Sequence, residues 1–360
     1  MIAAGGTGGH LYPGVALARE FERQMPGSEA MFVGTTRGLE TKVVPKEGFE
    51  LITIAARGVM GKGVGGALQG LAVVPLGVAQ CLAVCRKRRP DLAIGVGGYT
   101  SPPLILAAFL LGIKRVIVEP NVHPGVANRA LAPISHLVFV SFADAVPYFG
   151  SDKTRIVGTP IRREFLQAQS VYPAMNGPTL LVLGGSQGAR SINRAMVVAL
   201  PALIAAHPGL RVIHQTGERD YEDVASAYRS YRIADAPAQI EAVPFLYDMP
   251  RAFREADLIV SRSGATTVAE ITACGKPAVL IPFPHAIHGH QERNARVLER
   301  AGAAQVIVDA RLSDAVLAGA ISALLTRPDH LREMARCSRS LGQADAADAI
   351  VSECRALVTG

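Results

Sequence analysis

The chain has 360 residues, of which 49% are hydrophobic and 19% charged, and its formal net charge is +7. This composition is typical of a globular protein, and the length predicts two domains, because a single core rarely grows past about 250–300 residues. The positive charge is compatible with an anionic ligand or an anionic membrane surface. Nucleic acid is not expected as a partner, because the chain has neither an RNA-binding signature nor a basic stripe interleaved with aromatic residues.

The cysteines are odd in number and include no CxxC pair, which favours free thiols in a reducing compartment and argues against a zinc site. They are Cys81, Cys85, Cys274, Cys337 and Cys354. The apolar segment 71–85 is interrupted by Pro75, Gly77 and Gln80, so we expect no membrane-spanning helix there. The sequence therefore predicts a protein that is soluble or bound at a membrane surface.

Short apolar runs alternate with longer stretches whose apolar residues recur at helical spacing, as in 13–23. Strands are expected at 30–33, 92–96, 115–118, 137–140, 180–183, 212–214, 258–260 and 278–281. This alternation predicts parallel sheets covered on both faces. The stretch from 158 to 178 lacks a strong strand, so the domain junction is expected there. The expected domains are 1–160 with a C-terminal helix at about 335–360, and 161–334.

Each half opens on an apolar strand that runs into a glycine loop and then a helix. The loops are GGTGGH at 5–10 and GGSQGAR at 184–190. Two such halves predict doubly wound α/β domains with a ligand cleft between them, at the carboxyl ends of the strands. The first strand has only Ile2-Ala3-Ala4 before its loop, fewer than the roughly five residues of a central strand, which indicates that residues preceding Met1 belong to it.

A glycine loop at a helix N-terminus offers unpaired N–H groups and the positive end of the helix dipole, which suits phosphate or diphosphate. A nicotinamide enzyme is disfavoured, because Leu11 stands where the dinucleotide fingerprint needs its third glycine and Gly34-Thr35 where it needs an acid. Neither loop continues as Gly-Lys-Ser/Thr, so an ATP-hydrolysing P-loop is disfavoured as well.

His10 ends the first loop and is the candidate general base. A lone histidine is more often a helix cap or a core residue. Beside an anion-binding loop, however, a neutral imidazole is well placed to take a proton from a sugar hydroxyl, and no Ser-His-Asp or HExxH pattern competes for it.

A second constellation runs from Arg262 to Glu270, between the strand 258–260 and a helix. Its small residues suit phosphate, and Glu270 is placed where a carboxylate can accept both hydroxyls of a ribose. The alternative is a glutamate that only favours the helix dipole. We expect no metal at the histidines of the loop 282–291.

Together these residues resemble the MurG family, which transfers N-acetylglucosamine from UDP to undecaprenyl-diphosphoryl-N-acetylmuramoyl-pentapeptide. The resemblance runs essentially from end to end. Its motifs are GGTGGH at 5–10 with Pro13-Gly14, GGYTS at 97–101, Glu119-Pro120-Asn121 with Asn128-Arg129, GTPIR at 158–162, the loop 184–190, the segment 262–270, and His290-Gln291 with Asn294-Ala295.

The resemblance implies a GT-B fold of two Rossmann-like domains, the second of which binds UDP-N-acetylglucosamine. Leu246 is expected at the uracil, Glu270 at the ribose, the 265–267 turn at the diphosphate and Gln291 at the sugar. The implied donor-binding residues are Thr7, Gly8, Gly9, Asn121, Arg162, Ser186, Leu246, Ala265, Thr266, Thr267, Val268, Ala269, Glu270 and Gln291. The first-domain members of this set face the cleft. The implied acceptor-binding residues are Tyr99, Glu119 and Asn128.

The chain departs from the family pattern at three places. Val118-Glu119-Pro120-Asn121 stands where the family often has His-Glu-Gln-Asn, and Thr159 stands where it often has Gly-Asn-Pro. His288-Gly289 replaces a frequent acidic pair. The first two departures bear on the acceptor side and the last on the donor side.

The mechanism we favour is a single in-line displacement with inversion. His10 removes the proton of the acceptor 4-hydroxyl, which attacks the anomeric carbon opposite the UDP leaving group. Glu119 is the alternative base, and no cofactor or metal is expected. The rival functions are another GT-B activity, such as a UDP-N-acetylglucosamine 2-epimerase or a diacylglycerol glycosyltransferase, and a sugar-nucleotide-binding subunit without activity.

A membrane contact is expected for one apolar stretch of the first domain. Its residues are Leu68, Leu71, Val73, Val74, Leu76, Val78 and Leu82. Lys62 precedes it, Arg86-Lys87-Arg88-Arg89 follows it, and no acid interrupts these charges, which suits anionic headgroups. A core helix is the alternative. We expect a peripheral enzyme at the cytoplasmic face of the inner membrane.

Overall fold

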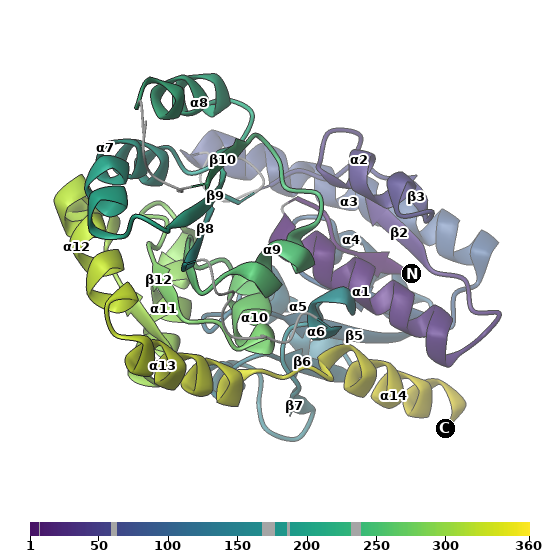
Figure 1. Cartoon of the computed structure of the whole chain (residues 1–360). Helices are drawn as coiled ribbons and strands as arrows, with labels where there is room; N and C mark the ends of the chain where they lie inside the picture. Colours follow the sequence, from purple (N-terminus) through teal and green to yellow (C-terminus); the bar gives the residue numbers. More distant parts are fainter. Residues whose placement is uncertain (7, 59–62, 168–176, 186–187, 232–238) are drawn as a thin grey trace. The chain divides into compact units, whose positions relative to one another are not determined.

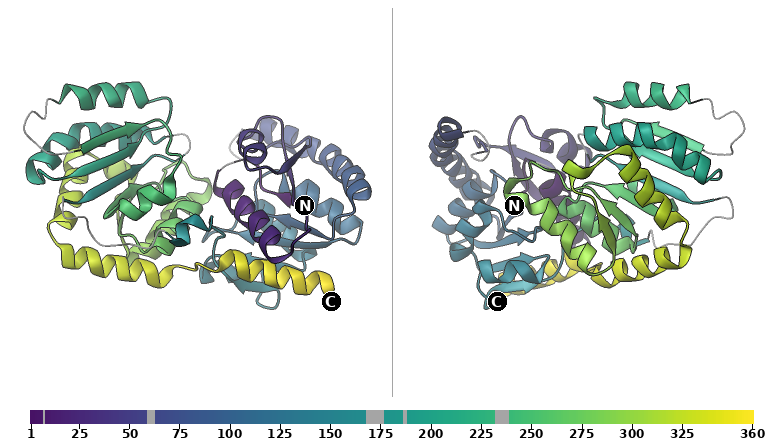
Figure 2. Two further views of the ribbon diagram at one scale, coloured as in Figure 1. Left: turned by 45° about the vertical axis from the view of Figure 1, so that its right-hand side comes forward. Right: turned by 90° about the vertical axis from the view of Figure 1, so that its left-hand side faces the viewer.

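The computed structural model describes residues 1–6, 8–58, 63–167, 177–185, 188–231 and 239–360. They form two compact units, one of residues 1–162 with 343–360 and one of residues 163–342. Each unit is a parallel sheet with helices packed on it (Figures 1 and 2). The predicted α/β class with two Rossmann-like sheets is therefore confirmed.

The first unit has seven parallel strands in the order β3-β2-β1-β4-β5-β6-β7. The strands are β1 (Ile2–Ala3), β2 (Met31–Gly34), β3 (Glu50–Thr53), β4 (Leu92–Gly95), β5 (Lys114–Glu119), β6 (Leu137–Val140) and β7 (Thr154–Ile156). The helices are α1 (Gly8–Gln24), α2 (Glu40–Lys46), α3 (Gly63–Arg88), α4 (Ser101–Leu110), α5 (Val126–Leu131), η1 (Ala132–Ile134), η2 (Ala143–Tyr148) and α14 (Ala346–Thr359). The strand order reverses between β1 and β4, which is where doubly wound sheets bind ligands.

The second unit has six parallel strands in the order β10-β9-β8-β11-β12-β13. The strands are β8 (Thr179–Leu183), β9 (Arg211–Gln215), β10 (Gln239–Val243), β11 (Leu258–Ser261), β12 (Ala278–Leu280) and β13 (Ala304–Val306). The helices are α6 (Glu164–Gln167), α7 (Arg190–Ala206), α8 (Tyr221–Ser230), α9 (Met249–Glu255), α10 (Ala265–Cys274), η3 (Ile287–Gly289), α11 (His290–Arg300), η4 (Asp309–Arg311), α12 (Asp314–Leu325) and α13 (Pro328–Leu341). Its order reverses between β8 and β11.

The predicted strands are interior strands of the two sheets, which are buried on both faces. The four edge strands β3, β7, β10 and β13 are not indicated by the sequence pattern. Each includes half-buried or exposed positions and lacks a long apolar run. Apolar periodicity therefore locates the strands that need burial and misses those at the sheet edges.

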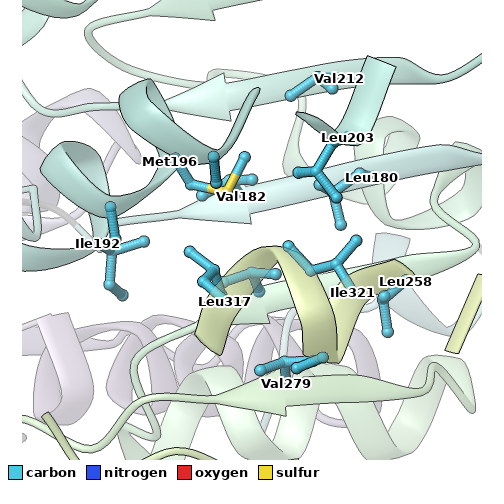
Figure 3. Packing of buried hydrophobic residues seen from close by; sticks show 14 of the residues in the cluster. Leu180, Val182, Ile192, Met196, Leu203, Val212, Leu258, Val279, Leu317 and Ile321 are labelled. Atoms are coloured by element: carbon cyan, nitrogen blue, oxygen red, sulfur yellow. The ribbon is translucent and has the colours of Figure 1, made fainter. Parts of the chain in front are cut away.

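The core of the second unit shows why its interior strands are apolar. Met196 and Leu203 of α7 and Leu317 and Ile321 of α12 pack with side chains of β8, β9, β11 and β12 in one buried cluster (Figure 3). Removing such side chains from water contributes about 1.5–3 kcal/mol each.

The last two helices belong to different units. In α13, Ser338 Oγ donates to Ile271 O (3.4 Å) and Arg339 Nη2 to Cys274 O (3.3 Å), both on α10. Helix α14 lies along α1 (Figure 2), where Arg23 pairs with Asp348 at 3.0 Å. The division between the units falls after residue 342, compared with about 335 in the expected domains.

Helix α3 runs without a break through Pro75, which had been expected to interrupt the segment 71–85. Among the described residues, no helix is both long and apolar enough to cross a membrane.

A buried histidine ties β9 to α7 in the second unit. His214 Nδ1 is hydrogen-bonded to Tyr228 Oη (2.7 Å) and Nε2 to Asn193 Oδ1 (3.0 Å). Asn193 Nδ2 in turn donates to Thr216 O (2.9 Å) and Asp220 Oδ2 (2.9 Å). Burial lowers the pKa of His214 to about 3. The neutral ring therefore fixes the helix that follows the second glycine loop.

This histidine makes the stability of the second unit depend on pH. Below about pH 6.5 the unfolded chain binds a proton at His214 that the folded chain does not bind until about pH 3, so the free energy of unfolding falls as the pH falls through this window. The slope reaches about 1.4 kcal/mol per pH unit. Hydrogen exchange of β9 amides at pH 7 and pH 4.5 measures it. In His214→Gln this part of the pH dependence should disappear, and an unchanged dependence would contradict the assignment.

Candidate active site

Two glycine loops of the first unit meet at the reversal point of its sheet. A Cβ built on Gly98 would lie 2.3 Å from Gly5 O, so the two backbones approach too closely for any side chain at Gly98. Thr100 Oγ1 accepts from Gly5 N (3.0 Å), and Ser101 Oγ accepts from Gly97 N (3.0 Å). The first of these hydrogen bonds fixes the loop after β1 against the loop after β4, and the second stabilises the loop after β4 itself.

The side chain of His10 lies in this junction. His10 is the third residue of α1 and is half-buried. A Cβ on Gly97 would lie 2.8 Å from Cδ2 and 2.9 Å from Nε2 of its ring, and one on Gly98 would lie 3.7 Å from Nδ1. The absence of side chains at 97 and 98 therefore creates the space that the imidazole occupies.

Glu119 is the centre of a buried cluster at the end of β5. Its side chain accepts from Asn121 N (3.0 Å), Asn121 Nδ2 (3.1 Å), Gly125 N (3.0 Å) and Asn128 Nδ2 (2.9 Å). Burial raises the pKa of Glu119, and these hydrogen bonds oppose the rise. Asn128 Nδ2 also donates to Val118 O (3.1 Å) and lies close to Gly97. The structure thus brings Glu119, Asn121 and Asn128 together beside the glycines that border the His10 ring.

The other first-unit candidates lie around the same loops. The ring of Tyr99 covers Gly6, because a Cβ there would lie 3.1 Å from Tyr99 Cε1. The guanidinium of Arg162 stacks on Tyr12 of α1, 5.3 Å from the ring centroid. Gly8 and Gly9 form the start of α1. Thr7 lies outside the described residues.

In the second unit, helix α10 begins directly after β11. Its N-cap residue Gly264 supplies no side-chain cap to the first-turn N–H groups. Thr267 and Ala269 are half-buried, and the side chains of Ala265, Thr266, Val268 and Glu270 are buried. The N–H of Val268 donates to Gly264 O (2.9 Å), so it is already used within the helix. An anion at this end would therefore meet the N–H groups of the turn that precedes Val268.

Gln291 is positioned by contacts of both its main chain and its side chain. Ser263 Oγ donates to Gln291 O (2.8 Å), and Gln291 Oε1 accepts from Phe283 N (2.9 Å). Asn294 Nδ2 donates to Ser263 O (3.3 Å). Gln291 therefore lies beside the turn that starts α10.

Arg262 joins four segments around that turn. Nη1 donates to Ile281 O (3.0 Å) and Pro282 O (3.1 Å) and pairs with Asp309 Oδ1 (2.6 Å). Nη2 donates to Ser191 Oγ (2.9 Å), which itself donates to Asp309 Oδ1 (2.7 Å). The arginine thus fixes the ends of β11 and β12 to α7 and η4.

The second glycine loop is linked to the segment that carries Leu246. Gln215 Nε2 donates to Gly185 O (2.8 Å) and to Pro244 O (3.4 Å). Leu246 is half-buried between two exposed aromatic residues, Phe245 and Tyr247. Ser186 lies outside the described residues. Among the residues that are described, no group of three or more His, Cys, Asp and Glu side chains is arranged to hold a metal ion, the loop 282–291 included.

The chain matches two family descriptions in succession. Residues 1–140 match the glycosyltransferase family 28 N-terminal domain, and residues 179–350 match the family 28 C-terminal domain. The chain belongs to glycosyltransferase family 28.

Relatives of this family 28 chain cover nearly its whole length. It is 45% identical over 357 residues to the UDP-N-acetylglucosamine–N-acetylmuramyl-(pentapeptide) pyrophosphoryl-undecaprenol N-acetylglucosamine transferase of Geobacter sulfurreducens, covering 98% of this chain and 97% of that one. The transferase of the same name from Thermodesulfovibrio yellowstonii is 41% identical, covering 99% and 98%. The crystal structure of Acinetobacter baumannii MurG is 31% identical with a TM-score of 0.75, covering 98% and 97%. The chain is therefore a member of the MurG family, with the GT-B fold.

A UDP-N-acetylglucosamine 2-epimerase from Neisseria meningitidis shares the fold of this family 28 chain at 15% identity and a TM-score of 0.66. That likeness covers 98% of each chain and shows the architecture alone.

Sequence reasoning did not single out three side chains that organise these sites. Arg262 belongs to the segment 262–270, but the sequence assigned it no role. Asp309 belongs to no recognised motif, and neither does Glu40, which follows β2. The only signal for these residues would have been the burial of a polar side chain. Which polar side chains are buried depends on segments that are distant in the sequence.

The Arg262–Asp309 pair should contribute measurably to stability. Its side chains are only 14% and 19% exposed, so Arg262→Ala leaves a poorly hydrated carboxylate without its counter-ion and two carbonyls without their donor. We expect a loss of about 3 kcal/mol in the free energy of unfolding, measured with urea. Arg251→Ala is the control, because Arg251 is 64% exposed and its pair with Glu255 should contribute less than about 1 kcal/mol. Equal losses of unfolding free energy in both variants would contradict this contribution of the Arg262–Asp309 pair.

Proposed function

We propose that His10 is the general base with which this chain transfers N-acetylglucosamine, with inversion, from UDP to the 4-hydroxyl of lipid-linked N-acetylmuramoyl-pentapeptide. The chain is a UDP-N-acetylglucosamine-dependent hexosyltransferase of peptidoglycan synthesis, as its family membership and relatives show. It converts undecaprenyl-diphosphoryl-N-acetylmuramoyl-pentapeptide into the corresponding disaccharide lipid. The observation that supports His10 as the base is the seating of its ring against Gly97 and Gly98.

The choice of His10 over Glu119 rests on exposure. The carboxylate of Glu119 accepts four hydrogen bonds from its own neighbours, and the residue is 2% exposed. Using it as a base would break the cluster that orients Asn121 and Asn128. His10 is half-buried, so its ring is more accessible than the carboxylate of Glu119. Glu119 acts instead as the support of the acceptor side.

The donor is assigned to the second unit. The α- and β-phosphates would accept from the first-turn N–H groups of α10, where no side-chain cap competes. Glu270 would hold the ribose, Leu246 the uracil and Gln291 the sugar hydroxyls. Asn121, Arg162 and the start of α1 would complete the set from the first unit. Tyr99 and Asn128 would contact the acceptor.

In the proposed reaction, the acceptor oxygen forms a bond to the anomeric carbon of N-acetylglucosamine as its proton passes to His10. The bond from that carbon to the β-phosphate oxygen breaks, and the electron pair leaves with UDP. Helix N-termini stabilise the developing charge, a role worth about 2.7–4 kcal/mol per donor in measured cases.

The proposal requires that UDP appear only when the acceptor is present. An epimerase would turn over UDP-N-acetylglucosamine without any lipid, and a binding subunit would release no UDP in either case. A UDP-release assay with and without a defined lipid acceptor separates these functions.

His10→Ala should lower the turnover number by about 10²–10⁴-fold, the usual contribution of a general base. The affinity for UDP, measured by calorimetry, should stay unchanged, because the donor is assigned mainly to the second unit. Glu119→Gln tests the alternative base in the same assay. Near-normal turnover in His10→Ala would remove His10 from the role.

An apolar face of the first unit supports a peripheral membrane site. On α3, the exposed residues Ala72, Pro75, Leu76, Ala79 and Ala83 follow one another at helical spacing. Helix α4 packs beside α3 and ends in the exposed side chains of Phe109 and Leu110.

Not every residue of the expected membrane stretch lies on this face. Leu82 packs against the first-unit core, and Val73, Val74 and Val78 are half-buried. Lys62 and the side chains of Leu68 and Leu71 lie outside what the structure describes. At the end of α3 the basic residues Arg86, Lys87 and Arg89 are exposed, and Arg88 pairs with Glu50. We therefore infer that this face docks on anionic lipid at the cytoplasmic side of the inner membrane.

Changing Arg86, Lys87 and Arg89 together to Gln should weaken binding to anionic vesicles, because each basic residue near such a surface contributes about 1 kcal/mol. Cosedimentation with vesicles measures it, and added salt should weaken wild-type binding as well. The matched control changes the exposed Arg229, Arg254 and Arg327 of the second unit to Gln, with the same loss of charge. Equal weakening in both triple variants would show that only net charge matters.

A further inference from the structure

Glu40 is a buried carboxylate that joins two loops of the first unit. It is the first residue of α2 and is 1% exposed. Oε1 accepts from Thr35 N (3.0 Å) and Thr35 Oγ1 (3.0 Å), and Oε2 accepts from Gly6 N (3.3 Å). One carboxylate thus connects the end of β2 to the loop between β1 and α1.

Glycines leave the space in which this carboxylate lies. A Cβ built on Gly38 would lie 1.9 Å from Glu40 Oε2, one on Gly34 2.6 Å from Cγ, and one on Gly5 3.1 Å from Oε1. In the part of the chain that the structure describes, no basic side chain forms an ion pair with Glu40. A buried carboxylate without a counter-ion is stable only if hydrogen bonds replace its hydration, so its bonds to Thr35 and Gly6 are strongly favoured.

The bond to Gly6 has two consequences for the active site. The N–H of Gly6 is used by the protein and is not offered to a phosphate, and the carboxylate places negative charge beneath this end of the loop. Gly6 also precedes α1 closely, and His10 lies in the first turn of that helix. The position of Gly6 therefore affects where the imidazole stands against Gly97.

We propose that Glu40 is a positioning residue for His10, acting through Gly6. This inference rests on the proposed function of His10 as the base. The carboxylate holds the loop so that the imidazole reaches the acceptor hydroxyl, and a displacement of about 1 Å in such a contact can cost about 10²-fold in rate.

Glu40→Gln separates this role from simple anchoring of α2. The amide oxygen can still accept from Thr35, but the amide nitrogen then faces the N–H of Gly6, donor against donor. We expect the turnover number to fall by about 10²-fold. The affinity for UDP should be preserved. Thr35→Val is the matched control, because it removes one hydrogen bond to Glu40 and leaves the bond to Gly6, and its turnover should stay close to wild type.

Gly38→Ala provides a second route to the same displacement. Its Cβ would push the carboxylate away without changing any charge, and Gly38 does not adopt a positive φ, so alanine adds no backbone strain there. Turnover should fall as in Glu40→Gln, with the urea midpoint recorded for both variants. Wild-type turnover in either folded variant would overturn the proposal.

The double variant His10→Ala/Glu40→Gln decides whether Glu40 acts through His10. Residues that act as one unit have non-additive effects, so the double variant should turn over no more slowly than His10→Ala alone. A further loss of about 10²-fold would show that Glu40 serves another part of the site. Near-normal turnover of the single variant His10→Ala would instead contradict the proposed base, a result that is independent of the Glu40 variants.

Discussion

The close approach of the backbone at Gly98 to the carbonyl of Gly5 is the constraint on which the first-unit site depends. The loops after β1 and β4 belong to neighbouring strands on opposite sides of the reversal point, and they touch without intervening side chains. This contact leaves room for one aromatic-sized ring, which His10 occupies. Thr100 holds the contact through its hydrogen bond to Gly5 N, and Ser101 stabilises the loop after β4, so backbone geometry sets the position of the imidazole.

In the two units, side chains of opposite charge hold the strand-end loops that carry the candidate site residues. In the first unit, the buried carboxylates of Glu40 and Glu119 accept from backbone N–H groups at the ends of β1, β2 and β5. In the second unit, Arg262 donates instead to the backbone carbonyls of Ile281 and Pro282, after β12. Carboxylates consume N–H groups, whereas basic side chains leave them available. This difference agrees with the assignment of the anionic diphosphate to the second unit and of the neutral acceptor hydroxyl to the first.

Burial explains why these charged residues are also supports of the fold. Arg262, Glu40 and Glu119 each make several hydrogen bonds, because an ion removed from water must recover its hydration from the protein. Substitution of any of them is therefore expected to affect both stability and geometry.

The sequence by itself determined the class of the fold and most of the residues around the two loops. Glycine clusters after apolar runs can be recognised locally, since they reflect short-range backbone geometry, and interior strands can be recognised because both of their faces need apolar residues. The edge strands, the course of α3 through Pro75 and the core packing of Leu82 could not be read in this way, because they depend on which faces neighbouring elements cover.

The tertiary structure alone decided which polar residues act as supports. Glu40 looks in sequence like any glutamate in the first turn of a helix, and Asp309 like any surface acid. Their partners Gly6, Ser191 and Arg262 lie 34 to 118 residues away along the chain. The free energy of such contacts comes from desolvation and hydrogen bonding after the chain has folded, so no local pattern of residues records them.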